Sequence, residues 1–426
     1  MKRLLQSLLQ WKLRILAMAI LRRYRPTVVA VTGSVGKTST VEAIYTVLSA
    51  SFTVRKSLKN YNNEIGIPLS IIGVESGGRS PFKWLAVFAT ALRLILWKSG
   101  YPKVLVLEMG ADHPGDLGYL LRFVPLTIGV VTSVAPVHLE FFKTVEAVAA
   151  EKAAIVSRLP KTGTAILNYD DKLVRAMAAK IPKSSRMFGL LSKADVYATG
   201  ISLNQTNQKL GGITFTLHYR GETATVALPH VIAEHLVYSA LAAAAVGITL
   251  GIPLPTIAGR LKKFEPPAGR MRLIAGIKKT LIIDDSYNSS PLPAKKALWQ
   301  LGKLTAKGKK VAVLGDMLEL GSYAETAHQE VGAAAAEYGV GYLITVGERS
   351  RDIVRGAIEK GLSKDHCFNF PTSLEAGKFL QQQLATGDLV LIKGSQGVRM
   401  ERVVKEVMAR PERAVELLVR QGREWQ

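Results

Sequence analysis

The sequence predicts an α/β protein with mostly parallel sheets, and three observations support this fold class. From residue 27 onward, short runs of β-prone apolar residues alternate with segments whose apolar residues recur at helical spacing, which is typical of βαβ units. A glycine-rich turn joins the first strand to the first helix, as in phosphate-binding loops. Polar residues follow several strands, at the sheet edge where ligands bind.

The first α/β unit is expected over residues 27–267. Its strands are predicted at residues 28–31, 104–109, 126–132 and 163–167, and its helices at residues 40–48, 144–159 and 232–247. Alternating β-prone segments near residues 195–200, 213–219 and 223–228 predict a small antiparallel addition. Pro266, Pro267 and Gly269 indicate a linker.

A second α/β unit is expected over residues 268–426. Its strands are predicted at residues 281–284, 310–314, 342–346 and 389–392. Helices are predicted between them, at residues 294–303, 323–338, 350–361 and 372–385. This alternation implies a second parallel sheet with crossover connections.

The composition indicates a globular, strongly basic protein. Its 426 residues are 48% hydrophobic and 21% charged, enough for two or three domains with real cores. A single cysteine, Cys367, excludes a disulfide framework and a cysteine-rich metal site, and makes the cytoplasm the default compartment. The net charge of +23 favours anionic partners. Without a basic–aromatic module or an arginine-rich tract, we do not expect nucleic-acid binding.

Residues 1–26 predict a basic amphipathic helix. Lysines and arginines interrupt its apolar residues, which excludes a signal peptide and a membrane-spanning helix. Two interpretations stay open: the helix lies on an anionic membrane surface, or it docks on the protein's own core. Residues 81–98, with Trp84 and Trp97 near their ends, also suit a membrane interface, although a buried helix is favoured there.

The glycine-rich turn predicts an ATP site. Gly33 and Gly36 allow backbone N–H groups to approach an anion, and the helix that follows adds its positive dipole end. Lys37 supplies a charge for the phosphates, and the Thr38 hydroxyl is a ligand for Mg²⁺. The loop is a shorter variant, because Val31 stands where the general pattern has its first glycine. The predicted ATP contacts are Gly33, Ser34, Val35, Gly36, Lys37, Thr38 and Ser39.

Further polar residues at strand ends extend this site. Glu108 ends an apolar strand, where a carboxylate suits Mg²⁺. His138 follows another strand and is a candidate for metal or phosphate binding. Lys152 lies on a helix, and its residue type and position alone favour a surface lysine. In the second unit, polar clusters at residues 284–291, 314–320 and 391–395 predict one shared cleft.

In this order, the segments resemble the Mur ligase family of ATP-dependent amide-bond-forming enzymes. The resemblance extends from about residue 27 to about residue 410. Its detail is most similar to the branch that adds D-alanyl-D-alanine to UDP-N-acetylmuramoyl-tripeptide. The segments that carry it are residues 32–39, 60–68, 107–111, 138–140, 284–288, 314–320 and 393–395.

The resemblance implies a central P-loop ATPase domain and a Rossmann-like C-terminal domain. It also implies a reaction of peptidoglycan precursor synthesis, and so of cell wall biogenesis. ATP phosphorylates the muramoyl-peptide carboxylate, and the amine of D-alanyl-D-alanine attacks this acyl phosphate to give an amide, ADP and phosphate.

The resemblance also implies roles for single residues. The implied catalytic groups are Lys37, His138 and Lys152. The implied Mg²⁺ ligands are Thr38, Glu108, His138 and Lys152, the last after carbamylation of its amine. Asn288 is implied at the adenine, and Arg270 and Asp316 near the nucleotide. The residues expected to face the peptide substrates are Asn62, Asn63, Lys393 and Ser395.

The chain departs from the family pattern mainly at its start. Only 26 residues precede the first strand, so we expect the usual N-terminal UDP-sugar-binding domain to be absent. Gln396 also replaces a common arginine. Two alternatives therefore stay open: a ligase for a lipid-linked or polyglutamate-type acceptor, or a non-catalytic nucleotide-binding protein at the membrane. In both the ligase and the binding-protein reading, residues 1–25 and 81–98 would hold the chain at the inner face of the plasma membrane.

Overall fold

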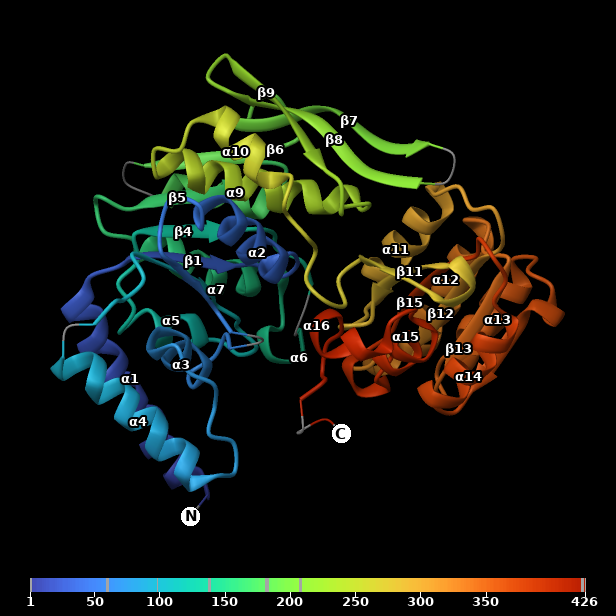
Figure 1. Ribbon diagram of the computed structural model, residues 1–426, viewed down its shortest axis with the longest axis horizontal. Coiled ribbons are helices and arrows are strands. Elements are labelled where there is room, and N and C mark those ends of the chain that lie inside the picture. Colours follow the sequence, from blue (N-terminus) through green and yellow to red (C-terminus); the bar gives the residue numbers. More distant parts are fainter. Residues whose placement is uncertain are drawn as a thin grey trace. The chain divides into compact units, whose positions relative to one another are not determined.

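The computed structural model describes residues 2–58, 61–97, 99–136, 139–180, 184–206, 209–422 and 425. Its contacts divide the chain into two α/β units (Figure 1). Unit 1 comprises Met1–Ser202, Thr214–Leu228 and Glu234–Phe264, and unit 2 comprises Leu203–Ile213, Pro229–Ala233 and Glu265–Gln426. The α/β class with largely parallel sheets is as the sequence predicts.

Unit 1 is built on a nine-stranded sheet with the order β2-β3-β1-β4-β5-β6-β7-β8-β9. The pairs from β2 to β7 are parallel. The central strands are buried runs of apolar residues, as expected for a parallel sheet covered on both faces. The strands are β1 (Thr27–Thr32), β2 (Val54–Lys56), β3 (Val104–Glu108), β4 (Ile128–Val131), β5 (Thr164–Asn168), β6 (Ser185–Gly189), β7 (Val196–Thr206), β8 (Lys209–Tyr219) and β9 (Glu222–Leu228).

Helices cover this sheet in two groups. The helices α2 (Lys37–Leu48), α9 (Val237–Thr249) and α10 (Leu254–Leu261) pack on one another, and α9 lies against β5 and β6. On the other side, one apolar cluster joins alternate residues of β1 and β3 to a second group of helices. That group is α1 (Lys2–Tyr24), α3 (Gly66–Ile72), α4 (Pro81–Leu96), α5 (Asp116–Leu120), α6 (Leu139–Phe142) and α7 (Val145–Ser157). A short helix, α8 (Lys172–Ala176), follows β5.

Helices α1 and α4 each carry two apolar stripes, one buried and one exposed. Each buries one apolar stripe in the core of unit 1. Each also leaves a second apolar stripe exposed, so the favoured interpretation of residues 81–98 as a buried helix is wrong. Among the helices that the structure describes, none combines the length and the apolar character that a membrane-spanning helix needs.

Unit 2 is built on a six-stranded sheet with the order β10-β11-β15-β12-β13-β14. Only β10, at one edge, is antiparallel to its neighbour. The strands are β10 (Arg272–Ala275), β11 (Leu281–Asp285), β12 (Lys310–Gly315), β13 (Tyr342–Val346), β14 (Cys367–Phe370) and β15 (Leu389–Lys393). The helices are α11 (Pro291–Lys303), α12 (Ala324–Glu337), α13 (Arg351–Glu359), α14 (Ser373–Gln383), α15 (Glu401–Val407) and α16 (Ala414–Leu417).

The strands that the sequence did not predict are short or only partly buried. They are β2, β6, β10 and β14, of three to five residues each. Such strands carry a weak periodic signal, because few of their side chains enter the core. The predicted β-prone additions exist as β7, β8 and β9, and β7 and β8 are longer than expected at 11 residues each.

Candidate nucleotide site

The carboxyl ends of three neighbouring strands of unit 1 form the site. In the parallel register, Val31 of β1 pairs with Glu108 of β3, and Thr32 pairs with Val131 of β4. The residues that follow these strands therefore meet at one edge of the sheet, where ligands of α/β proteins bind. The glycine-rich loop, Glu108 and residues 132–135 all lie there.

The loop has the geometry of a phosphate cradle. Gly36 has a φ of 86° and precedes α2, whose first turn has no capping side chain. This leaves the positive end of a 12-residue helix directed at the loop. Gly33 has a φ of 148°, and a Cβ there would lie 1.9 Å from Thr132 Oγ1. Lys37 Nζ donates to the Gly33 carbonyl at 2.9 Å, which folds the lysine back over the loop.

Residues after β4 hold this loop in place, and sequence reasoning missed them. The Ser34 N–H donates to the Ser133 carbonyl at 2.8 Å. The Val35 N–H donates to Ser133 Oγ at 3.2 Å, and Thr132 Oγ1 donates to the Val35 carbonyl at 2.6 Å. The adjacent hydroxyls of Thr132 and Ser133, directly after an apolar strand, were the available signal.

Lys152 is buried beside the loop, so the interpretation as a surface lysine is wrong. Lys152 is only 3% exposed. Burial, and then the positive charge of Lys37, lower the pKa of Lys152 to about 8, against the opposing charges of Glu151 and Asp112. The positive charge of Lys37 therefore acts on a second, buried lysine. Such an arrangement is unfavourable by itself and favourable once an anion is bound.

The described residues fit a bound Mg²⁺ of the kind that accompanies a nucleotide. Glu108 is 5% exposed at the end of β3, and its N–H donates to Ser57 Oγ at 2.8 Å. Thr38 is the second residue of α2, which follows the neighbouring strand β1. Mg²⁺ is commonly held by one or two protein oxygens together with phosphate oxygens and water, and a hydroxyl with a carboxylate suits that. Among the described residues, no group of three or more His, Cys, Asp or Glu side chains is arranged so that it could hold a metal ion. The predicted ligand His138 lies outside the described residues.

Of the two asparagines predicted to face the peptide substrates, Asn62 lies next to the end of β3 and Asn63 lies at the start of α3. The Gly110 N–H donates to the Asn62 carbonyl at 3.0 Å. A Cβ on Gly110 would lie 2.9 Å from Asn62 Nδ2, so the Asn62 amide packs directly on this glycine. Asn63 Oδ1 accepts from the Gly66 N–H at 2.9 Å, which orders the start of α3.

In unit 2, the polar clusters of β11, β15 and β12 lie side by side, because these strands are neighbours in the sheet. Lys393 Nζ lies 2.7 Å from Asp285 Oδ2 and donates to the Asn288 carbonyl at 2.9 Å. Ser395 Oγ accepts from the Leu318 N–H at 2.9 Å. Lys393 and Ser395 are thus engaged with the protein's own loops, and contact with a peptide substrate stays a prediction for both.

The loop after β11 is anchored by a buried carboxylate. Asp284 accepts from the Gly269 and Ser286 N–H groups, at 2.9 and 3.1 Å. Complete burial is the main cause that raises the pKa of Asp284 to about 6, and its hydrogen bonds oppose the rise. The Arg270 guanidinium lies 4.2 Å from the centroid of the Tyr287 ring, a cation–π contact. Contact of Arg270 and Asn288 with a nucleotide stays a prediction.

Asp316 at the end of β12 is also held by backbone groups. Its Oδ1 accepts from the Ser350 N–H at 2.7 Å, and its carbonyl accepts from the Ser395 N–H at 3.0 Å. A Cβ on Gly347 would lie 2.4 Å from the Asp316 carboxyl group, so a glycine is needed there. The Asp316 carboxylate therefore orders two loops of unit 2.

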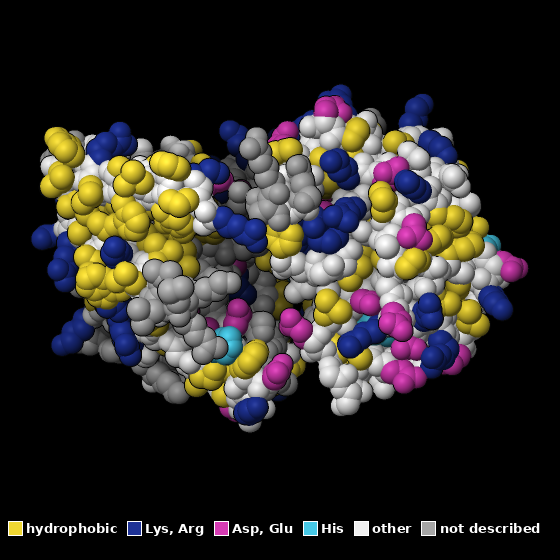
Figure 2. Space-filling view, turned by 90° about the horizontal axis from the view of Figure 1, so that it is seen from below, with side chains coloured by type: hydrophobic (Ala, Val, Ile, Leu, Met, Phe, Trp, Pro, Cys, Tyr) yellow, Lys and Arg dark blue, Asp and Glu magenta, His cyan; other side chains and the backbone are white. Residues whose placement is uncertain are grey.

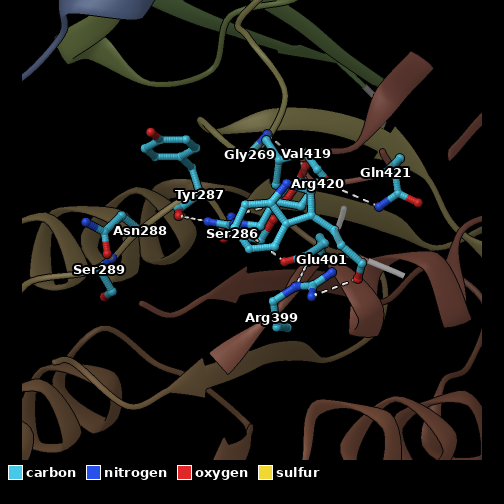
Figure 3. A network of polar contacts seen from close by, with 12 residues as sticks. Gly269, Ser286, Tyr287, Asn288, Ser289, Arg399, Glu401, Val419, Arg420 and Gln421 are labelled. Carbon is cyan, nitrogen blue, oxygen red and sulfur yellow. Dashed lines mark hydrogen bonds and ion pairs between the residues drawn. The ribbon is translucent and has the colours of Figure 1, made fainter. Parts of the chain in front are cut away.

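A network of charged residues from the C-terminal segment holds the loop after β11 (Figure 3). Sequence reasoning missed this network. Glu401 is fully buried and pairs with Arg399 Nε at 2.5 Å and with Arg420 Nη1 at 2.8 Å. Arg420 also donates to the carbonyls of Ser286 and Tyr287. No periodic pattern identifies this network, since Arg420 lies 19 residues from Glu401 and 133 and 134 residues from the loop residues that it contacts.

Comparisons with known proteins agree with this geometry. Residues 31–80 and 90–247 match the Mur ligase middle domain, and residues 269–396 match the Mur ligase, glutamate ligase domain. The chain is 30% identical over 400 residues to the UDP-N-acetylmuramoyl-tripeptide--D-alanyl-D-alanine ligase of Bacillus subtilis, covering 93% of this chain and 79% of the relative. The chain belongs to the Mur ligase family.

Solved Mur ligases have the same fold. A MurF structure from Acinetobacter baumannii superposes with a TM-score of 0.78 at 27% identity, covering 93% of this chain and 79% of that one. A MurF ligase from Thermotoga maritima in complex with ADP gives a TM-score of 0.74 at 27% identity, covering 96% and 84%. The Escherichia coli UDP-N-acetylmuramoyl-tripeptide--D-alanyl-D-alanine ligase is 31% identical, covering 89% of this chain and 76% of the relative. These findings confirm the predicted family and the predicted fold class.

Proposed function

We propose that this Mur ligase joins D-alanyl-D-alanine to the carboxylate of a muramoyl peptide, with cleavage of ATP to ADP and phosphate. The phosphate cradle is the observation that carries this proposal. Lys37 folds over it and the buried Lys152 feels the charge of Lys37, so the place suits a highly charged anion. The relatives that bear the name of this activity support the choice of substrates.

The proposed reaction has two steps, phosphoryl transfer to the acceptor and attack by the amine. A carboxylate oxygen of the acceptor attacks the γ-phosphorus, the bond to the β-phosphate oxygen breaks, and ADP leaves. The amine nitrogen of the dipeptide then attacks the acyl carbon, phosphate leaves, and the nitrogen gives up a proton. The transition state of phosphoryl transfer spreads charge over oxygens, so positioned cations lower its energy. We propose this role for Lys37, the first residue of α2, and its fold over the loop supports the proposal.

We propose that Lys152 acts after carbamylation. A lysine with a pKa of about 8 is neutral in roughly one-tenth of molecules at pH 7, whereas an unperturbed lysine is neutral in less than about a thousandth. Only the neutral amine attacks CO₂. The amine nitrogen bonds to the CO₂ carbon and gives up a proton, and the resulting anion relieves the repulsion from Lys37. Together with Thr38, Glu108 and His138 it would hold Mg²⁺. A ¹³C NMR signal from protein equilibrated with labelled CO₂, lost in Lys152→Met, tests this role.

We propose nucleotide contacts in unit 1 and in unit 2, each unit taken by itself. Gly33, Gly36 and the backbone around them bind phosphate, and Asn288 contacts adenine. Lys393 donates to the Asn288 carbonyl, and Arg420 donates to the carbonyls just before it, which supports a positioned adenine contact. The remaining proposed ATP contacts are Ser34, Val35, Ser39, Arg270 and Asp316.

For the peptide substrates we propose contacts from Asn62, Asn63, Lys393 and Ser395. Amide groups suit a peptide, since each offers donors and an acceptor. Asn62 supports this best, because its amide packs on Gly110, two residues beyond the metal candidate Glu108.

A lipid-linked acceptor is the second candidate. The observation that favours it is the exposed apolar surface of α1 and α4, which suits an enzyme at the cytoplasmic face of a membrane.

One assay separates these functions. ADP release is measured with D-alanyl-D-alanine plus a UDP-linked muramoyl tripeptide, with each omitted, and with the lipid-linked acceptor in detergent. Lys37→Met is the inactive control. Turnover that needs both substrates supports the ligase, and preference for the lipid-linked acceptor supports the second candidate. ATP hydrolysis that is indifferent to both substrates contradicts the ligase proposal.

A further inference from the structure

We propose that one face of helices α1 and α4 docks on an anionic lipid bilayer. This α1–α4 face consists of the exposed apolar side chains of the two helices and the residue that ends α4. They are Leu8, Trp11, Ile15, Phe82, Leu85, Leu92, Leu96 and Trp97. The proposal concerns a surface in unit 1 and does not depend on which amide the enzyme forms.

Helix α1 is apolar on two opposite sides. Leu13, Ala17 and Ile20 are fully buried against unit 1. Trp11 is 50% exposed and Leu8 is 46% exposed, and both point away from that side because they lie about half a helical turn from the buried stripe. A helix that only covers the core needs one apolar stripe, and its opposite side is normally polar. The second stripe of α1 therefore lacks a purpose within this chain's own core.

Helix α4 repeats this arrangement more strongly. Its buried side chains are Val87, Ala91 and Leu94. The opposite side carries Phe82, which is 84% exposed, and Leu85, which is 67% exposed. These positions continue through residues 89, 92 and 96 at the spacing of one helix face.

The two exposed stripes belong to one surface. Helices α1 and α4 pack on each other, and Tyr24 at the end of α1 donates a hydrogen bond to the Leu94 carbonyl in the last turn of α4 at 2.9 Å. Figure 2 views the molecule from the side on which these helices lie in Figure 1, and hydrophobic side chains gather there, with lysines and arginines around them. Contiguous exposed apolar surface of this kind marks an interaction site.

The charges favour an anionic bilayer over a second copy of this chain. No Asp or Glu occurs in residues 1–41 or 76–107, which include both helices. Exposed cations border the apolar stripes, among them Lys12, Arg22, Lys83 and Arg93. Two such faces would repel each other, whereas the combination of buried apolar side chains and bordering cations matches the interface of anionic lipids.

A hollow at the edge of this face suits a lipid phosphate. It has a volume of about 690 Å³ and is lined by Arg55, Arg93 and Trp97, among others, without an acidic residue. The Arg55 guanidinium is held in place by a hydrogen bond to the Ile71 carbonyl at 2.6 Å and by the Tyr101 ring at 5.0 Å. A tryptophan beside arginines is the usual composition at the level of lipid headgroups.

Vesicle sedimentation tests the proposal with the full chain. We expect binding to vesicles of phosphatidylglycerol and phosphatidylcholine at low salt, weaker binding at high salt, and little binding to phosphatidylcholine alone. The double variant Phe82→Ser/Leu85→Ser should weaken binding at least tenfold, and so should Lys83→Glu/Arg93→Glu. The matched control is Leu374→Ser/Val415→Ser, which removes two exposed apolar side chains of unit 2 and should bind as the unchanged protein does.

Two further measurements make the outcomes decisive. Circular dichroism and ligase activity in solution verify that the variants are folded, since none of the changed residues belongs to the nucleotide site. Light scattering reports the oligomeric state. The proposal is overturned if the unchanged protein ignores anionic vesicles at low salt, or if both face variants bind like the control. It is also overturned if the face variants dissociate an oligomer and leave vesicle binding unchanged.

Discussion

Replacing Glu401 by Gln tests whether the C-terminal network stabilises unit 2. Glu401 is 0% exposed, and its partner side chain in Arg420 is 4% exposed. The variant keeps the shape of the side chain but leaves two guanidinium groups, one of them deeply buried, without a counter-charge. Breaking a buried ion pair from one side costs about 3–5 kcal/mol, mainly because the remaining charge stays desolvated.

An exposed pair in the same unit provides the control. Glu325 Oε1 lies 2.7 Å from Arg355 Nη1, close to the 2.8 Å of the buried pair, but these side chains are 64% and 53% exposed. Because water screens it, Glu325→Gln should cost about 0–1 kcal/mol. The two variants therefore differ in how deeply the ion pair is buried, while the distance between its charged atoms is nearly the same.

Urea titration of each variant gives the free energy of unfolding. Trp425 is a local probe, since the Arg399 guanidinium lies 5.1 Å from its ring centroid. For a unit of this size, the expected loss in Glu401→Gln corresponds to a fall in Tm of roughly 6–20 °C. The KM for ATP should also rise, because Arg420 holds the loop that carries Asn288. Equal losses in Glu401→Gln and Glu325→Gln would refute the reasoning.

Three further changes probe the site. Gly33→Ala brings a Cβ to 1.9 Å from Thr132 Oγ1 at a strained φ, so the loop must shift. Nucleotide affinity, measured by calorimetry, should fall roughly 100-fold or more. A native circular dichroism spectrum is the control. Lys152→Met should lower turnover by about 10²–10³, as loss of one charge-stabilising group does. In CO₂-free buffer, where the amine is not carbamylated, it should raise the free energy of unfolding at pH 7, because the buried cation is gone. A variant that is both active and less stable contradicts this. Asp284 has its folded pKa raised from 3.8 to about 6, so its stabilisation is complete below about pH 4 and is lost as the pH rises through 6. The change is about 3 kcal/mol, and Asp284→Asn should flatten the pH profile of unfolding across that window.

Local patterns in the sequence determined the framework of this protein. Buried parallel strands are continuous apolar runs, and phosphate loops need glycines at fixed spacing, so β1, the loop after it and α2 follow from neighbouring residues. The same holds for Glu108, because a strand end is visible in the sequence and parallel strands bring their ends together.

Only the tertiary structure decided which charges are buried and which apolar faces are left uncovered. Lys152 looks like an ordinary helical lysine, but packing buries it beside Lys37 and shifts its pKa. Glu401 meets Arg420 because the C-terminal segment returns to β11. Helix α1 has two apolar stripes in its sequence, and only packing shows which one enters the core. Burial and pKa depend on residues that are distant in the chain, whereas periodicity reports only on neighbours.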